Sequence, residues 1–275
     1  MRRSFVAVAG LVSFSILSQS VVTQALAAPA RLPFRSTFES GNFSEWTGGI
    51  AGRMTVTNET ASQGTYSAKG VMVRGTTADH YRDFYFGNHP SVGGEAVSVD
   101  RGLWVSFNTR FDTGFTFGSA NVHKIALINF DDESARRRYQ IILNIWVPTG
   151  EYFLEHLVWN ADRSFNKAIP GLDQNIAPDA LMQRGAWERI KIFIKPNTPG
   201  QSNGIVRLWV NGVLKADRTS VAVRENTSFL PNKLIIGNYV TDTATDGVQR
   251  WDNIVVSDVD PDGTRPNPPT QTQAQ

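Results

Sequence analysis

The residues best suited to acid–base chemistry are the four histidines, His80, His89, His123 and His156. Histidine exchanges protons near neutral pH more readily than any other side chain. Three of them lie in segments that read as strands, close in sequence to Arg82, Lys124 and Tyr152. This grouping favours a site on neighbouring strands, although a single strand histidine is more often structural. Metal binding is a further alternative, which the lack of closely spaced histidine pairs disfavours.

Aromatic and amide side chains form a second set of candidates. Trp104 and Trp146 could stack on sugar rings, while Asn108, Gln140 and Asn144 could hydrogen-bond sugar hydroxyls. The alternatives are a tryptophan covered by a loop and amides that are merely solvated. The predicted substrate-binding residues are His80, Trp104, Asn108, Lys124, Gln140, Asn144, Trp146 and His156.

The segments that carry these residues alternate apolar and polar side chains, which is the pattern of strands with one face on a core. In the segment 79–87, for example, His80 and Arg82 share one face and Tyr81, Asp83 and Tyr85 the other. Alternation predicts strands over 54–58, 66–74, 79–87, 103–111, 122–130, 139–147, 152–159, 190–195, 206–210, 229–239 and 250–257. At least ten strands with almost no helix predict an all-β protein, an antiparallel two-sheet β-sandwich.

A long hairpin is the clearest local motif. Asn211-Gly212 suits a type I′ turn, because both central residues of that turn need a positive φ. With Trp187 opening one strand and Trp209-Val210 closing the next, the unit resembles the hairpin of concanavalin A-like jelly rolls. That superfamily includes laminin-G domains, legume lectins, several glucanases and several polysaccharide lyases.

The two ends of the domain carry a second resemblance. Residues 38–46, FESGNFSEW, are similar to the opening of many secreted β-sandwich domains, and residues 250–256 to their end. The resemblance implies that Phe38 starts a first strand that pairs with the last one, bringing Glu39 near Asp252. Relatives often hold a structural calcium near such a pair. A hydrogen-bonded turn without metal is the favoured alternative, because Ca²⁺ takes six to eight oxygen ligands.

Three short pieces resemble the strands of alginate-lyase-like and heparin-lyase-like enzymes: His80-Tyr81-Arg82-Asp83, Val122-His123-Lys124, and residues 152–156, YFLEH. The resemblance implies β-elimination at a uronate. Arg82 or Asn144 would neutralise the substrate carboxylate, His123 would remove the C5 proton, and Tyr152 or His156 would protonate the leaving oxygen. It predicts that His80 or Arg82, His123 and Asn144 line one groove.

Other functions stay open. A glycoside hydrolase would need two carboxylates on one strand face, whereas Asp131-Asp132-Glu133 runs into Arg136-Arg137-Arg138 and reads as a hairpin loop. The arginines there are either solvated or a rim contact for an anionic glycan. The main alternative to a lyase is a non-catalytic glycan- or protein-binding module of the laminin-G or lectin type at the cell surface. A purely structural or adhesive sandwich is the third.

The N-terminal residues indicate export. Arg2 and Arg3 precede a mostly apolar stretch, and Ala25-Leu26-Ala27 suits signal-peptide cleavage. A membrane anchor is the disfavoured alternative, because several serines interrupt the stretch. We expect a signal peptide over 1–27, a leader over 28–35, one domain over 36–257 and a disordered tail over 258–275. The expected location is secreted, periplasmic or cell-surface, with no membrane span in the mature chain.

Charge and cysteine content narrow the partners. Without residues 1–27, Lys and Arg fall from 27 to 25, equal to the 25 Asp and Glu. A neutral chain argues against nucleic acid as partner, while a local basic patch for an acidic glycan stays possible. The resemblance to lyases implies a polysaccharide partner, most simply an acidic one. The chain has no cysteine, which excludes thiol catalysis and makes stability depend on a large core. No cofactor is required by this interpretation.

Overall fold

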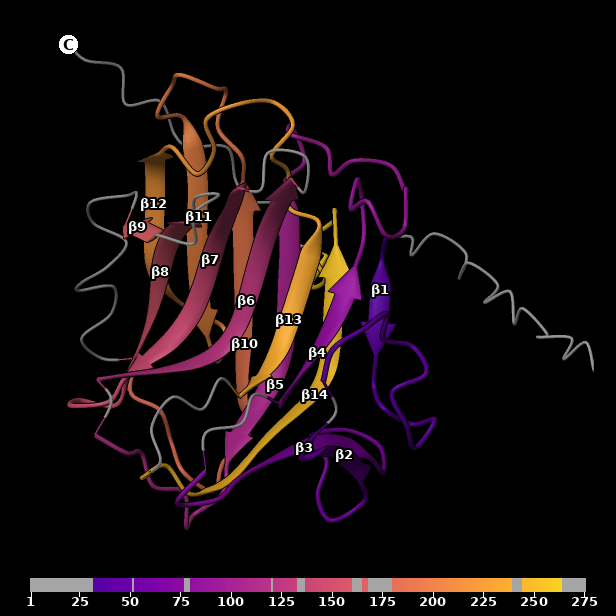
Figure 1. Ribbon diagram of the computed structural model, residues 1–275, viewed down its shortest axis with the longest axis vertical. Coiled ribbons are helices and arrows are strands. Elements are labelled where there is room, and N and C mark those ends of the chain that lie inside the picture. Colours follow the sequence, from indigo (N-terminus) through magenta and orange to yellow (C-terminus); the bar gives the residue numbers. More distant parts are fainter. Residues whose placement is uncertain are drawn as a thin grey trace, which may run out of the picture.

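The computed structural model describes residues 32–50, 52–76, 80–119, 121–132, 137–159, 165–167, 180–238 and 244–263. They form two antiparallel sheets stacked face to face, with the six-stranded sheet toward the viewer in Figure 1. Several predicted segments lie outside the described residues: the signal peptide, residues 28–31 of the leader, residues 133–136 of the hairpin loop and residues 264–275 of the tail. No helix in the described ranges is long and apolar enough to cross a membrane. The predicted all-β two-sheet sandwich is confirmed.

The six-stranded sheet has the order β4-β13-β6-β7-β8-β9. Its strands are β4 (His80–Tyr85), β6 (Val122–Asp132), β7 (Arg137–Trp146), β8 (Glu151–Trp159), β9 (Phe165–Lys167) and β13 (Lys233–Asn238). Consecutive strands β6, β7 and β8 form a meander, whereas β13 arrives from much later in the chain to separate β4 from β6. Side chains from distant parts of the sequence are thereby brought onto one face.

The eight-stranded sheet has the order β12-β11-β10-β5-β14-β3-β2, and β1 also pairs with β14. Its strands are β1 (Phe34–Ser36), β2 (Met54–Thr57), β3 (Ser67–Met72), β5 (Leu103–Phe111), β10 (Glu188–Lys195), β11 (Gly204–Val210), β12 (Val213–Val221) and β14 (Gly247–Ser257). The segments predicted from alternation all form strands, because burial of one sheet face enforces a period of two.

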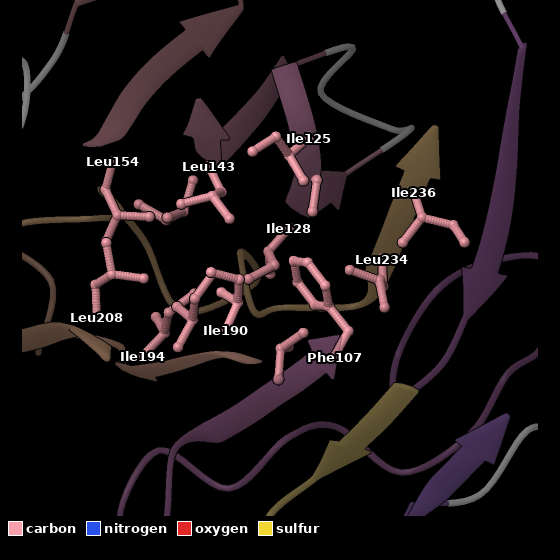
Figure 2. Packing of buried hydrophobic residues seen from close by; sticks show 14 of the residues in the cluster. Phe107, Ile125, Ile128, Leu143, Leu154, Ile190, Ile194, Leu208, Leu234 and Ile236 are labelled. Atoms are coloured by element: carbon pink, nitrogen blue, oxygen red, sulfur yellow. The ribbon is translucent and has the colours of Figure 1, made fainter. Parts of the chain in front are cut away.

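The core lies between the two sheets. Figure 2 shows Phe107, Ile190 and Leu208 of the eight-stranded sheet packed against Ile128 and Leu143 of the six-stranded sheet. These side chains are almost completely buried, and each contributes about 1.5–3 kcal/mol by leaving water. The large buried surface compensates for the missing disulfides.

The chain ends close the sandwich as predicted, with one correction. β1 pairs with β14 through Phe34–Val256 and Ser36–Ile254, so the first and last strands are neighbours. Phe38 does not start the first strand, however. It follows β1 with a φ of 60° and buries its ring against Trp46, which turns the chain away from the sheet.

Residues 258–263, assigned by sequence to the disordered tail, are attached to the eight-stranded sheet. Lys191 Nζ lies 3.2 Å from Asp260 Oδ1 and 2.8 Å from Asp262 Oδ2. Arg189 also pairs with Asp262, and Arg101 with Asp258 at 3.0 Å. Ion pairs to two residues of β10 and to Arg101 just before β5, rather than apolar burial, hold this segment. A composition rich in polar residues therefore did not indicate that it is ordered.

Candidate functional site on the outer face of the six-stranded sheet

The outer face of the six-stranded sheet, here called the front face, carries a row of polar side chains. Strand register places Tyr85 beside Lys233, Lys233 beside Asn129, and Asn129 beside Gln140. Neighbouring strands are about 4.8 Å apart, so these four groups form a continuous band across β4, β13, β6 and β7. The residues on either side of Tyr85, Asn129 and Gln140 in sequence, and Leu234 after Lys233, belong to the core, as alternation requires.

A charged cluster lies at the β4 end of this band, and we call it the front cluster. Its members are Asp83, Tyr85, His89, Asp131, Arg138 and Lys233. Tyr85 Oη donates to Asp83 Oδ2 at 3.0 Å, and Lys233 Nζ lies 3.4 Å from the same oxygen. Burial and the charge of Asp83 raise the pKa of Tyr85, so this phenol keeps its proton at neutral pH.

The other half of the front cluster is organised by Asp131. Arg138 Nε donates to Asp131 Oδ1 at 2.5 Å, while Lys233 Nζ and His89 Nε2 lie 3.9 and 4.0 Å from Oδ2. The imidazole of His89 stacks on the Tyr85 ring at 4.1 Å, and its Nδ1 accepts a hydrogen bond from Ser91 N. Asp83, His89 and Asp131 are each less than a tenth exposed, an unusual concentration of buried charge on an outer sheet face.

Two atoms on the front face are buried without a hydrogen-bond partner: Asn129 Nδ2 in the band and Asp83 Oδ1 in the front cluster. The remaining groups of the amides are paired: Gln140 Nε2 donates to Asn129 Oδ1 at 2.9 Å, and Trp159 Nε1 donates to Gln140 Oε1. A buried polar atom without a partner costs about 1–3 kcal/mol. A free carboxylate oxygen beside Tyr85 and a free amide donor two strands away are therefore features of a ligand or reaction site.

Toward the other end of the front face lies a second polar group. Asn144 Nδ2 lies 3.4 Å from Glu155 Oε2, and Asn144 Oδ1 is buried without a partner. Trp146 is 38% exposed and meets the Phe153 ring edge-on, and Lys124 lies opposite Asn144 in register. Between the two polar regions, Leu127, Ile142, Leu157 and Ile235 form a small apolar cluster against which Tyr81 and Trp159 pack.

Four of the predicted site residues thus lie on the front face: Lys124, Gln140, Asn144 and Trp146. The predicted base His123 does not. A bulge between Lys124 and Ala126 leaves His123 facing the core, where Nε2 lies 3.0 Å from Gln249 Oε1 and three phenylalanine rings surround the imidazole. Burial lowers its pKa to about 4. The predicted groove shared by His123 and Asn144 is therefore wrong.

Tyr152 and His156 also face the core. Tyr152 Oη donates to Glu188 Oε2 at 2.7 Å, which links the two sheets, and burial raises the pKa of Tyr152. His156 stacks on Tyr139, and burial lowers its pKa to about 4. Both residues lie on alternate positions of β8 whose neighbours face outward, so the predicted strand was right and the predicted face was wrong.

His80 and Arg82 lie on the inward face of the edge strand β4, behind the front cluster. His80 Nδ1 accepts a hydrogen bond from Arg53 N at 3.0 Å, and the Arg82 guanidinium lies 4.2 Å from the centre of the Phe43 ring. Segments from the N-terminal part of the chain cover both. Neither is brought together with the groups on the front face.

Trp104 and Asn108 point outward, as alternation predicts, but from the other sheet. Trp104 is 2% exposed and packs with Phe193 and Trp209. Asn108 Nδ2 donates to Ser62 Oγ at 2.7 Å. The face was predicted correctly; the sheet was not, because sheet membership depends on pairing with β10 and β14.

Glu39 and Asp252 bind the same loop instead of forming an open ligand set. Glu39 Oε1 accepts from Thr65 N and Tyr66 N at 2.9 and 3.0 Å. Asp252 Oδ2 accepts from Ser62 N, Ser62 Oγ and Gln63 N. Donor hydrogens directed at these oxygens do not fit a calcium ion at the same positions. Within the described ranges no three His, Asp or Glu side chains group as metal ligands.

The sequence interpretation missed Tyr85, Asn129 and Lys233, and it named His89 as a candidate without assigning it a role. Alternation did place Tyr85 and Asp83 on one face of their strand, opposite to His80 and Arg82, which was the available signal. The outward side of β4 is fixed by Lys233 and Ile235 of β13, a strand about 150 residues later in the sequence. No local pattern carries that information.

Comparison with known proteins identifies the family. Residues 38–255 match the family model described as polysaccharide lyase. Among solved structures, the endo-β-1,4-glucuronan lyase of the fungus Trichoderma reesei superposes with a TM-score of 0.59 at 14% identity, covering 82% of this chain and 94% of that one. Alginate lyase Aly36B gives 0.57 at 11% identity, covering 84% and 98%.

The PL-14 alginate lyase of the marine Aplysia kurodai gives 0.56 at 11% identity, covering 78% of this chain and 90% of that one. Sequence comparison with curated proteins found no match. At these identities the solved structures establish the shared jelly-roll fold, and the family model spans nearly the whole sandwich. The chain belongs to the polysaccharide lyase family.

Proposed function

We propose that this protein is an exported lyase that cleaves an acidic, uronate-containing polysaccharide by β-elimination at the front cluster. The observation that carries the proposal is the unpaired Asn129 amide donor on the same sheet face as the hydrogen-bonded Tyr85 and Asp83, with Lys233 between them, in a chain of this family. The structural neighbours include glucuronan and alginate lyases, which supports a uronate. The basic and apolar start of the sequence supports export.

The first requirement of the reaction is to make the uronate C5 proton acidic. A hydrogen bond from Asn129 Nδ2 to the substrate carboxylate would stabilise the charge that develops there as the proton leaves. Lys233, the neighbour of Asn129 in the band, adds a positive charge. Because Asn129 is buried, the substrate must displace outer side chains to reach it. The hydrogen bond then forms away from water, where it is strongest.

The second requirement is proton transfer. Tyr85 can accept the C5 proton on Oη as its own hydroxyl proton passes to Asp83 Oδ2, 3.0 Å away. The electrons of the C5–H bond form the C4–C5 double bond, and the C4–O4 bond breaks toward the leaving oxygen. Tyr85 then donates the transferred proton to O4, and Asp83 returns the other. The geometry favours Tyr85 over the buried His123 for this role.

Ultraviolet absorbance tests the proposal, because elimination creates a conjugated double bond. The purified protein is mixed with alginate, glucuronan, heparin and pectin, and absorbance is followed over time. Asn129→Ala and Tyr85→Phe should each lower kcat by about 100-fold or more. Asn203→Ala, in the exposed loop between β10 and β11, should stay within about twofold. Circular dichroism and thermal unfolding confirm that each variant folds.

Two results would contradict the proposal. Absence of absorbance change with every polymer, together with saturable binding of one of them, would favour the non-catalytic binding module. The 38% exposure of Trp146 on the front face supports that alternative, since exposed aromatic rings stack on sugars. Equal activity of Asn129→Ala and Asn203→Ala would instead move the site away from the front cluster.

A further inference from the structure

We infer that Trp159 and Gln140 are positioning residues that fix the side-chain orientation of Asn129 so that its amide nitrogen, and not its oxygen, is presented to the substrate carboxylate. The three residues, which we call the amide relay, lie on β8, β7 and β6. This inference rests on the proposed role of Asn129. It adds two residues that do not touch the reacting atoms.

The direction of the relay follows from donor and acceptor chemistry. The indole N–H of tryptophan can only donate, so the Gln140 atom that receives it must be the oxygen. The Gln140 nitrogen is then directed at Asn129, and the Asn129 atom that receives it, 2.9 Å away, must also be the oxygen. Asn129 Nδ2 is left unpaired. A single donor on β8 thereby determines which atom of a side chain two strands away is free.

Apolar packing holds the Trp159 indole, the first donor of the amide relay, in place. Trp159 lies against the apolar cluster of Leu127, Ile142, Leu157 and Ile235, and its strand neighbour across the sheet is Arg138. Gln140 and Asn129 are 4% and 0% exposed, so water does not compete for their amide groups. The apolar cluster in the middle of the front face thus supports the indole that orients the polar band.

The orientation matters because an amide is nearly symmetric in shape and opposite in polarity at its two ends. Rotated by half a turn, Asn129 would direct its carbonyl oxygen at the substrate carboxylate and repel it. Loss of the Trp159 donor removes the preference between the two rotations. A carboxylate in place of Gln140 can only accept hydrogen bonds. Asn129 must then turn its amide nitrogen toward that carboxylate, which leaves its carbonyl oxygen facing the substrate.

Two substitutions separate positioning from simple packing. Trp159→Phe keeps the aromatic contact and removes the donor, and should lower kcat about tenfold with a smaller change in KM. Gln140→Glu still accepts from Trp159 but can no longer donate to Asn129 while ionised, and should lower kcat about 100-fold at neutral pH. Part of this loss should recover on acidification, because the introduced carboxyl group donates again once it is protonated. Trp209→Phe, on the eight-stranded sheet, is the matched control and should stay within about twofold.

A second measurement does not depend on activity. The side-chain amide resonances of Asn129 and Gln140, assigned with Asn129→Asp and Gln140→Glu, should shift or broaden in Trp159→Phe and stay unchanged in Trp209→Phe. Unchanged resonances in Trp159→Phe, or Gln140→Glu activity equal to that of Trp209→Phe, would overturn the relay. If no polymer is cleaved by the wild type while the resonances respond as expected, the relay stands and the proposed function fails.

Discussion

His123 and Asn129 lie six residues apart on one strand and have opposite environments. In a regular strand, residues six positions apart lie on the same face. The bulge between Lys124 and Ala126 inserts one residue, so His123 and Asn129 lie on opposite faces. His123 therefore contacts Gln249 in the core, and Asn129 joins the front face. The role of each residue follows from this one irregularity, since neither side chain can reach the other side of the sheet.

The core position of His123 leads to a prediction for His123→Leu. Gln249 Oε1 would lose its partner at 3.0 Å, which costs about 1–3 kcal/mol of stability. The imidazole faces away from the front cluster, so kcat on any polymer that the wild type cleaves should change less than about threefold. Urea unfolding and initial elimination rates measure the two effects. A stable variant with activity reduced 100-fold would restore His123 as the base.

At the scale of elements, the strands were predictable and their assembly was not. Alternation within 103–111 and 139–147 reproduces β5 and β7 to within a residue or two, because the burial of one face imposes a local signal. Which sheet a strand joins depends on pairings such as β13 between β4 and β6, which are set by distant residues. Trp104 and Gln140, both correctly placed on outward faces, consequently lie on opposite sides of the molecule.

The hairpin between β11 and β12 is an element whose turn was predictable in detail. Asn211 and Gly212 have φ values of 51° and 80°, as the Asn-Gly pair predicts. Asn211 Oδ1 also accepts a hydrogen bond from Arg189 N at 2.8 Å, so the turn residue is tied to β10. A local signal sufficed here because the positive φ of both residues is a requirement of the turn itself.

Two variants of this turn measure separately how much the Asn211 side-chain hydrogen bond and the positive-φ backbone conformation contribute to stability. Asn211→Gly keeps the backbone conformation and removes the side-chain acceptor, and should lower the free energy of unfolding by about 1 kcal/mol. Asn211→Ala removes the same acceptor but, unlike the glycine variant, keeps a β-carbon at positive φ, and should cost about 1 kcal/mol more than Asn211→Gly. Chemical denaturation of the three proteins gives both differences. Equal stability of the glycine and alanine variants would contradict the conformational part.

At the scale of the whole molecule, polar side chains cross between the sheets. Tyr152 of the six-stranded sheet donates to Glu188 of the eight-stranded sheet, and His123 meets Gln249 in the same way. Such buried pairs fix how one sheet lies over the other, because leaving any partner unpaired is costly. The sandwich thus holds ionisable groups in its interior, and its stability must depend on their protonation.

His123 and His156 determine the main part of the pH dependence of the free energy of unfolding. Burial lowers the pKa of each from 6.5 to about 4; for His156 the nearby Val223 backbone opposes the shift without cancelling it. Between pH 6.5 and 4 the unfolded chain therefore binds up to two more protons than the folded one. Stability is fully present above this window and decreases as pH falls through it, by about 3 kcal/mol for each histidine over the whole window.

Two buried carboxyl groups act in the opposite direction. Burial raises the pKa of Glu188 and of Asp252, so the folded protein takes up their protons at a higher pH than the unfolded chain and recovers some stability near the acidic end. Urea unfolding from pH 8 to 4 should show the net loss. His123→Leu should be less stable at pH 8 yet lose about half as much on acidification, because one of the two buried histidines that cause the loss is then absent. An acid sensitivity identical to that of the wild type would show that His123 is not neutral and buried in the folded protein.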